Sequence, residues 1–163
     1  NAGVPKIFAP GERFLYLGDE YPLEVTEGRI SRLTLSHGNF VLYRNHATDE
    51  RQVFVRWYKM RAREIFAERV AFYARDMGLT FNGIRITSAR MRYGSCSFDN
   101  RLAFSYRLVM APYHIIDYII VHELAHVRIK DHSRDFWKYV EARLPGYRDS
   151  KAWLKAKGHL LDV

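Results

Sequence analysis

The sequence predicts an α+β fold in which an antiparallel-rich β-sheet packs against one long helix, with a second, buried helix at the centre. Three observations support this prediction. Residues 13–43 hold four short apolar runs separated by turn clusters, as in antiparallel strands. Residues 50–77 carry one apolar stripe at helical spacing, and residues 115–127 are apolar nearly all round, which is typical of a buried helix.

Composition bounds the kind of protein that the chain can form. With 163 residues, of which 48% are hydrophobic and 15% aromatic, the chain can bury a sizeable core and is not disordered. We expect a single domain over residues 1–163, with a β-meander at 13–43 and helices and a hairpin at 50–163. No run of about 18 apolar residues occurs, so no membrane span is expected.

The cysteine content and the charge indicate where the protein works and what it can bind. The one cysteine, Cys96, excludes an internal disulfide, and no signal-peptide pattern is present, so we expect a cytoplasmic protein. The chain starts without methionine, and we expect Asn1 and Ala2 to be the remnant of a tag. A net charge of +8 and a pI of about 9.7 admit nucleic acid or another anionic partner.

The first elements along the chain are strands. They are expected at residues 13–17, 21–26, 30–36 and 40–43, with turns at 18–20 and 37–39. In the second and third strands apolar residues alternate with polar ones, which predicts a sheet with one solvated face. Because this segment lacks a catalytic constellation, we interpret His37 and His46 as surface or turn residues.

A long helix is expected next. Asp49 can cap its N-terminus and Gly78 can end it, so we place it at residues 50–77. The core-facing stripe comprises Tyr58, Ala62, Ile65, Phe66, Val70, Tyr73 and Met77.

A hairpin follows a short strand at residues 83–87. Its arms are expected at 90–97 and 101–106, around a turn at 98–100. Gly94, Ser95, Cys96 and Ser97 are small, so a peptide substrate could bind there as an added strand. Ordinary packing against neighbouring side chains would explain the same residues.

The next helix carries the clearest signal for chemistry. His122 and His126 are four residues apart, so on a helix their imidazoles lie on one face. Zinc holds histidine nitrogens at about 2.0–2.1 Å, so two ligand nitrogens must lie roughly 3.4 Å apart. Glu123 lies about 100° further round the helix, where a general base belongs. The alternative is a pair of core histidines with Glu123 in a salt bridge.

The residues alone leave more than one candidate for the third ligand. His132 can join the other two only if the helix stops near 129–131 and the chain doubles back. Asp131 tolerates the left-handed conformation and could make this turn. Glu141, on the following helix, is the competing ligand, and Cys96 has the chemistry of one.

The remaining helices are signalled by their caps. Ser133 can cap a helix that is ended by Pro145-Gly146, and its core face would carry Phe136, Trp137, Val140 and Leu144. A last helix is expected at residues 150–157, where Trp153 and Leu154 would dock on the body of the protein.

The chain resembles the YgjP-like metallopeptidase family, which is close to the SprT-like and WLM zinc peptidases. The resemblance rests on the stretches at 91–97, 107–109, 112, 116–118, 122–126 and 132–137. It implies a zincin-like fold, with one zinc ion held by His122, His126 and His132, and with Glu123 catalytic. Tyr93 and Ser105 depart from the family pattern, which usually has tryptophan and asparagine there. Members are typically bacterial and intracellular.

These observations lead to a hypothesis of a zinc-dependent metalloendopeptidase that acts on a peptide or protein substrate. Tyr113, His114 and Tyr139 are the candidate oxyanion donors. The alternative is a nucleic-acid-associated protein. In that case protease activity would depend on DNA, as relatives that act on DNA-crosslinked proteins suggest, or zinc would be purely structural, with Cys96, Asp135 or Glu141 as fourth ligand.

Overall fold

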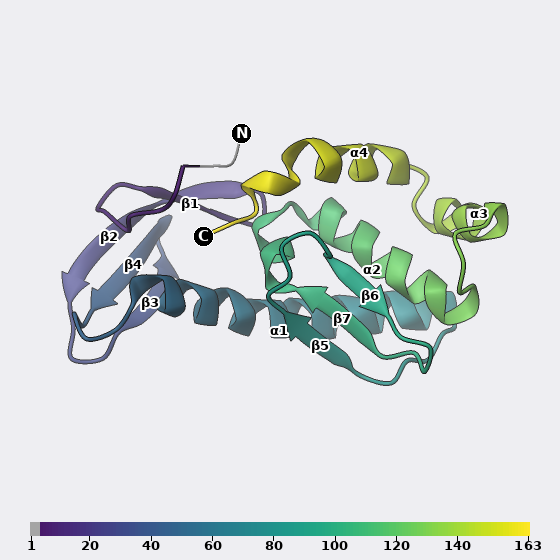
Figure 1. The fold of residues 1–163 in the computed structure, drawn as a ribbon, viewed down its shortest axis with the longest axis horizontal. Helices are drawn as coiled ribbons and strands as arrows, with labels where there is room; N and C mark the ends of the chain where they lie inside the picture. The colour runs from purple at the N-terminus through teal and green to yellow at the C-terminus, as the bar shows by residue number, and fades with distance from the viewer. Residues whose placement is uncertain (1–3) are drawn as a thin grey trace.

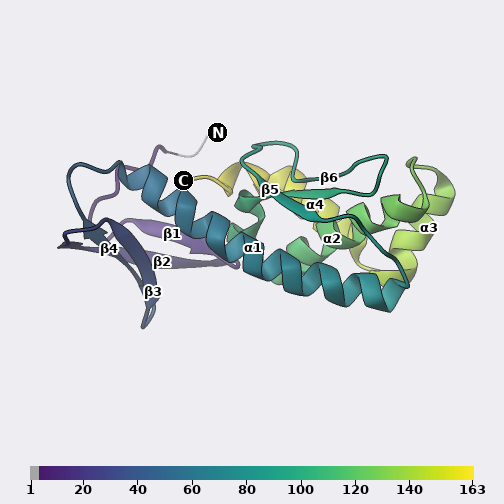
Figure 2. The same cartoon turned by 90° about the horizontal axis from the view of Figure 1, so that it is seen from below.

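The computed structural model describes residues 4–163, so the expectation for Asn1 and Ala2 lies outside the described residues. It confirms the α+β class: two small sheets lie at different points along one long helix (Figures 1 and 2). The strands are β1 (Arg13–Tyr16), β2 (Asp19–Glu27), β3 (Arg32–Ser36), β4 (Asn39–Arg44), β5 (Ile84–Thr87), β6 (Gly94–Cys96) and β7 (Leu102–Ser105). The helices are α1 (Glu50–Met77), η1 (Tyr106–Met110), α2 (Tyr113–Arg128), α3 (Arg134–Arg143), α4 (Tyr147–Lys157) and η2 (Gly158–Leu160).

The first sheet is not the meander that the sequence predicts. Its strand order is β1-β2-β4-β3, and β4 runs parallel to β2. The strands form close to where they were expected, but β4 carries the more buried side chains, with Phe40 and Leu42 almost fully buried. A central strand is covered on more sides than an edge strand, so β4 takes the central place and β3 becomes the edge. Turns alone could not reveal this order, because hairpins fix only neighbouring pairs.

The long helix α1 matches its prediction at both ends. The Asp49 side chain accepts a hydrogen bond from the backbone N–H of Arg51 at 2.9 Å, and Gly78 ends the helix with φ at 66°. Its first half packs on the first sheet, where Phe14 and Phe54 stack with ring centroids 4.3 Å apart. Its second half packs on the second sheet, where Phe66 stacks on Phe104 at 4.5 Å. Thus α1 joins the two parts of the molecule.

The second sheet provides the frame for the site. Its order is β5-β7-β6, with β7 antiparallel to β6 and parallel to β5, so the predicted hairpin is confirmed and β6 is an edge strand. The arm that was expected from residue 90 becomes a strand only at Gly94, although the Tyr93 carbonyl still accepts from the N–H of Ser105 at 2.8 Å, and the Tyr93 side chain lies against the C-terminal segment. There a Cβ on Gly158 would overlap the Tyr93 hydroxyl, so the two residues are in close contact.

The helix α2 lies between the second sheet, α1, α3 and α4 (Figure 1). Most of its side chains are buried, as its all-round apolar sequence predicts. Arg69 of α1 fixes it through two hydrogen bonds of 2.6 Å to the Asp117 carboxylate. This paired geometry is the strong form of an arginine–carboxylate contact, and it sets the position of α2 against α1.

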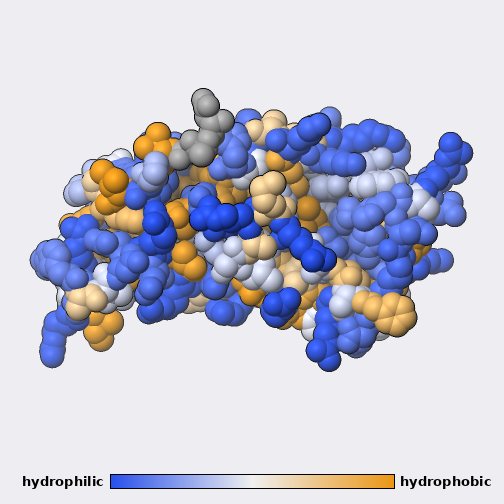
Figure 3. Space-filling view, viewed as in Figure 1, coloured by the Kyte–Doolittle hydropathy of each residue, from blue (hydrophilic) through white to orange (hydrophobic). Residues whose placement is uncertain are grey.

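The last two helices cover the remaining side of α2. The α3 helix follows its prediction: Ser133 Oγ accepts from the N–H of Phe136 at 3.3 Å. The α4 helix begins at Tyr147, three residues before the expected start, because Tyr147 stacks on Trp137 of α3. Figure 3 shows mostly hydrophilic residues over α3 and α4. Within residues 4–163, no helix has both the length and the apolar character that crossing a membrane would require.

The Arg69–Asp117 pair provides a test of how α2 is held. In Asp117→Asn the negative charge is lost from a partly buried place, one of the two hydrogen bonds from Arg69 is lost because an amide NH2 cannot accept, and the other is weakened. We expect the free energy of unfolding to fall by about 1–3 kcal/mol in urea titrations. The matched control is Glu64→Gln in the exposed Arg61–Glu64 pair, which should cost about 0.5 kcal/mol or less. Equal effects of the two variants would contradict the assignment.

Candidate metal centre

Three imidazoles meet at the C-terminal end of α2. The Nε2 atom of His132 lies 3.1 Å from Nε2 of His126 and 3.4 Å from Nε2 of His122. One ring nitrogen from each residue falls within 4.8 Å of the others, and this is the group among the described residues that could hold a metal ion. The competing residue Glu141 is not part of it, since its carboxylate faces Arg148 at 3.5 Å.

The His126 ring is held in one tautomer by the end of its own helix. Its Nδ1 lies 2.9 Å from the carbonyl oxygen of Ile129. A carbonyl can only accept, so Nδ1 must carry the proton and Nε2 must present its lone pair towards His132. Backbone carbonyl contacts of this kind are the usual support for histidines that bind metals.

The geometry and charge state of the three rings fit a divalent ion. Separations of 3.1 and 3.4 Å between Nε2 atoms are close to the roughly 3.4 Å expected in a tetrahedral zinc site. Burial, with the neighbouring His126 and His132, lowers the pKa of His122 to about 3. Burial also lowers the pKa of His126. These two rings are therefore neutral at physiological pH, which is the form that binds a metal.

The chain reversal that brings His132 back does not use the residue that the sequence suggested. Asp131 is not among the described residues with positive φ, so the expected left-handed turn at Asp131 is wrong. Instead α2 ends directly in extended backbone at Ile129, with φ −129° and ψ 109°, which suits a β-branched residue. Asp131 stabilises the following turn, where its Oδ1 accepts from the N–H of Ser133 at 3.1 Å.

Aromatic side chains of α3 support the imidazoles from outside. Phe136 stacks on His126 with ring centroids 4.3 Å apart, and it meets both His122 and His132 edge-on at 5.1 Å. The ring centroids of Trp137 and His122 lie 5.5 Å apart. Nδ1 of His122 is buried without a hydrogen-bond partner among the described residues, so packing sets the direction of this ring.

Glu123 lies beside the imidazoles, on the face of α2 that contacts β6. It is 6% exposed, and burial raises the pKa of its carboxyl to about 7, while the nearby charge of Arg92 acts in the opposite direction. Gly94 makes room for it: a Cβ there would lie 2.9 Å from Glu123 Cγ and 2.9 Å from Ile119 Cγ2. The bare stretch that the sequence shows at Gly94 therefore accommodates α2 itself.

Two hollows adjoin Glu123, and both are lined by Arg92, Gly94, His122 and Glu123. The first, the histidine-side hollow, holds about 270 Å³. It is also lined by Ser95, Cys96, His126, Lys130 and His132. The second, the α4-side hollow, holds about 280 Å³. It is also lined by Met91, Tyr93, Tyr118, Ile119, Lys151 and Leu154.

The candidate substrate residues fall unequally around these hollows. Gly94, Ser95 and Cys96 line the histidine-side hollow, and all three belong to the edge strand β6. Ser97 does not line it; its hydroxyl instead accepts from the N–H of Arg101 at 2.9 Å. Burial raises the pKa of the Cys96 thiol, so this residue is a thiol and not a thiolate.

The sequence missed several residues at the site. The candidate oxyanion donors Tyr113, His114 and Tyr139 line neither hollow, whereas Tyr118, Arg92, Lys130 and Lys151 do. Tyr118 precedes His122 by four residues, so the helical spacing already contained the signal. The other three come from separate elements, and no spacing in the sequence places them beside α2.

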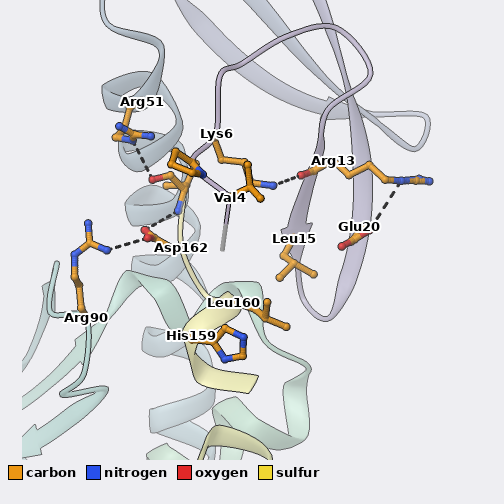
Figure 4. A pocket seen from close by; sticks show the side chains of 12 residues that line it. Val4, Lys6, Arg13, Leu15, Glu20, Arg51, Arg90, His159, Leu160 and Asp162 are labelled. Carbon is orange, nitrogen blue, oxygen red and sulfur yellow. Dashed lines mark hydrogen bonds and ion pairs between the residues drawn. The ribbon is translucent and has the colours of Figure 1, made fainter. Parts of the chain in front are cut away.

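A further hollow is remote from the imidazoles. It holds about 490 Å³ between the N-terminal segment, β1 and the C-terminal residues (Figure 4). Its charged groups are satisfied within the protein. Arg90 pairs with Asp162 at 2.8 Å, and Arg51 donates to the Val163 carbonyl at 3.0 Å.

Comparison with known proteins gives two findings. The model of the YgjP-like metallopeptidase domain matches residues 2–157. The crystal structure of a metallopeptidase zymogen, abylysin of Pyrococcus abyssi, superposes with a TM-score of 0.51 at 23% identity, and the match covers 56% of this chain and 92% of that one. The structural likeness is one of fold. No curated protein matches the chain.

The contact between Gly94 and Glu123 can be tested by filling the gap. In Gly94→Ala the added Cβ would force Glu123 and Ile119 to shift, so we expect unfolding to become easier by about 1–3 kcal/mol in urea titrations. Ser95→Ala, at the next position of β6, is the control and should change stability by about 0.5 kcal/mol or less. An equally stable Gly94→Ala protein would show that this contact is loose.

Proposed function

The chain belongs to the YgjP-like metallopeptidase family, and we propose that it is a zinc-dependent endopeptidase with a glutamate general base. In this proposal His122, His126 and His132 hold the ion, and Glu123 handles the proton. One observation carries it: three imidazole nitrogens converge within 4.8 Å, with a buried carboxylate one residue after the first. Three protein ligands also leave a fourth position open, as in catalytic zinc sites.

Zinc, when bound, would lower the pKa of a water molecule towards about 7 and polarise the scissile carbonyl. The protein's own contribution is the placement of Glu123. Burial favours the protonated form of this carboxyl, while a cation beside it would favour the ionised form, so the group is suited to exchange a proton near neutral pH. Glu123 would take a proton from the attacking water and give it to the leaving amine.

The edge strand β6 is the proposed platform for the substrate. It pairs with β7 on one side only, and Gly94, Ser95 and Cys96 lie along the histidine-side hollow. A peptide in extended conformation could add there through main-chain hydrogen bonds, which gives affinity without restricting the sequence. The substrate carbonyl would then lie beside Glu123, because Gly94 and Glu123 are in contact.

Metal content tests the three-histidine site directly. Protein purified without chelators should contain about one zinc ion per chain by mass spectrometry, and chelation should lower its melting temperature. His132→Ala should lose most of the zinc at micromolar concentration, because only two ligands remain. His46→Ala, which alters an exposed histidine near Glu27, should retain it. Full zinc binding by His132→Ala would exclude His132 as a ligand.

The proton-transfer role is tested by Glu123→Gln. This change keeps the size of the side chain but removes its basicity, so zinc content should stay near one per chain. Peptide cleavage should fall by about 10²–10⁴-fold, the range of general base catalysis. Glu141→Gln, on α3, is the matched control and should cleave like the unmodified protein. If Glu123→Gln cleaves within twofold of normal, another group must be the base.

A further inference from the structure

The charges around the two hollows are one-sided. Besides Glu123 and the three histidines, the charged residues that line them are cations: Arg92 in both, Lys130 in the histidine-side hollow and Lys151 in the α4-side hollow. Asp131 lies close to His132 on the chain, but its carboxylate accepts from Ser133 and does not line either hollow. The Glu123 carboxylate is thus the one acidic group against three cationic side chains.

Two of these cations, Arg92 and Lys151, form no ion pair within residues 4–163, although Arg92 lies near the Glu123 carboxylate. Neither makes a side-chain hydrogen bond there, and the Lys151 ammonium lies 4.5 Å from the centroid of the Trp137 ring. Lys130, by contrast, donates to the Ser97 carbonyl and to Asn100. The remote 490 Å³ hollow shows the usual arrangement, in which Arg13 and Arg90 face Glu20 and Asp162. Lys6 and Arg51 of that hollow also lack an acidic side-chain partner, but each donates to a backbone carbonyl, whereas the side chains of Arg92 and Lys151 make no hydrogen bond within residues 4–163.

The walls of the α4-side hollow indicate the shape of its occupant. Tyr93, Tyr118, Ile119 and Leu154 give it apolar sides, and Arg92 and Lys151, both exposed side chains, supply its charge. Such a hollow suits a group that has a short aliphatic stem and a negative end. Among protein side chains, glutamate has that form, and its carboxylate can accept charge-assisted hydrogen bonds from both cations.

We propose that the α4-side hollow is a specificity subsite that binds a glutamate side chain of the peptide substrate, with Lys151 and Arg92 as its partners. This inference rests on the proposed peptidase function. It places the glutamate next to the scissile bond, because the same hollow is lined by His122 and Glu123. Lys151 would exchange its contact with Trp137 for the carboxylate.

A peptide fits these observations better than a nucleic acid does. Nucleic-acid sites combine cations with aromatic faces that are free to stack on bases. Here the two aromatic residues that line the hollow are held by the protein: Tyr118 is buried and meets His122 edge-on at 5.9 Å, and the Tyr93 hydroxyl lies against Gly158. The neighbouring edge of β6 offers a row of backbone groups that suits an extended peptide.

Binding measurements test the subsite without requiring cleavage. Zinc-loaded full-length Glu123→Gln protein would be titrated against fluorescein-labelled octapeptides that differ only in one central residue, which is Glu, Gln or Lys. We expect the Glu peptide to bind about tenfold more tightly than the Gln peptide, and the Lys peptide to bind most weakly. In Lys151→Glu this order should reverse. Lys155→Glu, one turn further along α4 and outside the hollow, should keep the ratio of the Glu and Gln peptide affinities within twofold of its original value.

Three results would overturn the proposal. The first is equal binding of the Glu and Gln peptides. The second is a Lys155→Glu variant that loses the preference as fully as Lys151→Glu, which would show that the preference depends only on the net charge of the protein. An eight-nucleotide single strand could also bind more tightly than the Glu peptide in a Lys151-dependent way, which would assign the hollow to nucleic acid. Circular dichroism and zinc content of each variant show that it is folded. A glutamate preference without any peptide cleavage by the unmodified protein would uphold the subsite and refute the endopeptidase function.

Discussion

The site depends on one constraint: three imidazole lone pairs must point at a common position. Two of them come from one face of α2, and the third arrives only because the helix ends at Arg128 and the chain reverses within a few residues. Ile129 contributes in two ways. Its extended backbone ends the helix, and its carbonyl oxygen accepts a hydrogen bond from Nδ1–H of His126. Neighbouring lone pairs at 3.1 Å repel unless a cation or a proton lies between them, so this arrangement favours metal binding.

The rest of the fold holds α2 in place around that constraint. Arg69 ties it to α1, Gly94 allows β6 to approach Glu123, and Phe136 of α3 packs on all three rings. The first sheet contributes indirectly, because it anchors the other half of α1. The polar residues of the site are thus carried by one helix and the loop after it, while their directions are set by contacts from three other elements.

Much of this was predictable from local signals. Both ends of α1, the Ser133 cap and the pairing of His122 with His126 follow from short-range rules that need only a few neighbouring residues. The strand order of the first sheet could not be predicted, because β4 is inserted next to β2 according to burial and not according to sequence order. The turn before His132 was misassigned for a related reason: extended backbone at Ile129 achieves what a left-handed residue was expected to do. Arg92 and Lys151 were missed because their position beside Glu123 exists only in three dimensions.

The contact between Tyr93 and Gly158 links the site to a residue that does not line it. Tyr93 lines the α4-side hollow, and its hydroxyl occupies the space that a side chain at position 158 would need. Any larger residue at 158 would force Tyr93 to shift and would therefore change the shape of the hollow that Tyr93 lines. Positions 93 and 158 should therefore vary together among related chains, so that an inherited change at the C-terminal end would alter substrate choice without touching a residue that binds substrate.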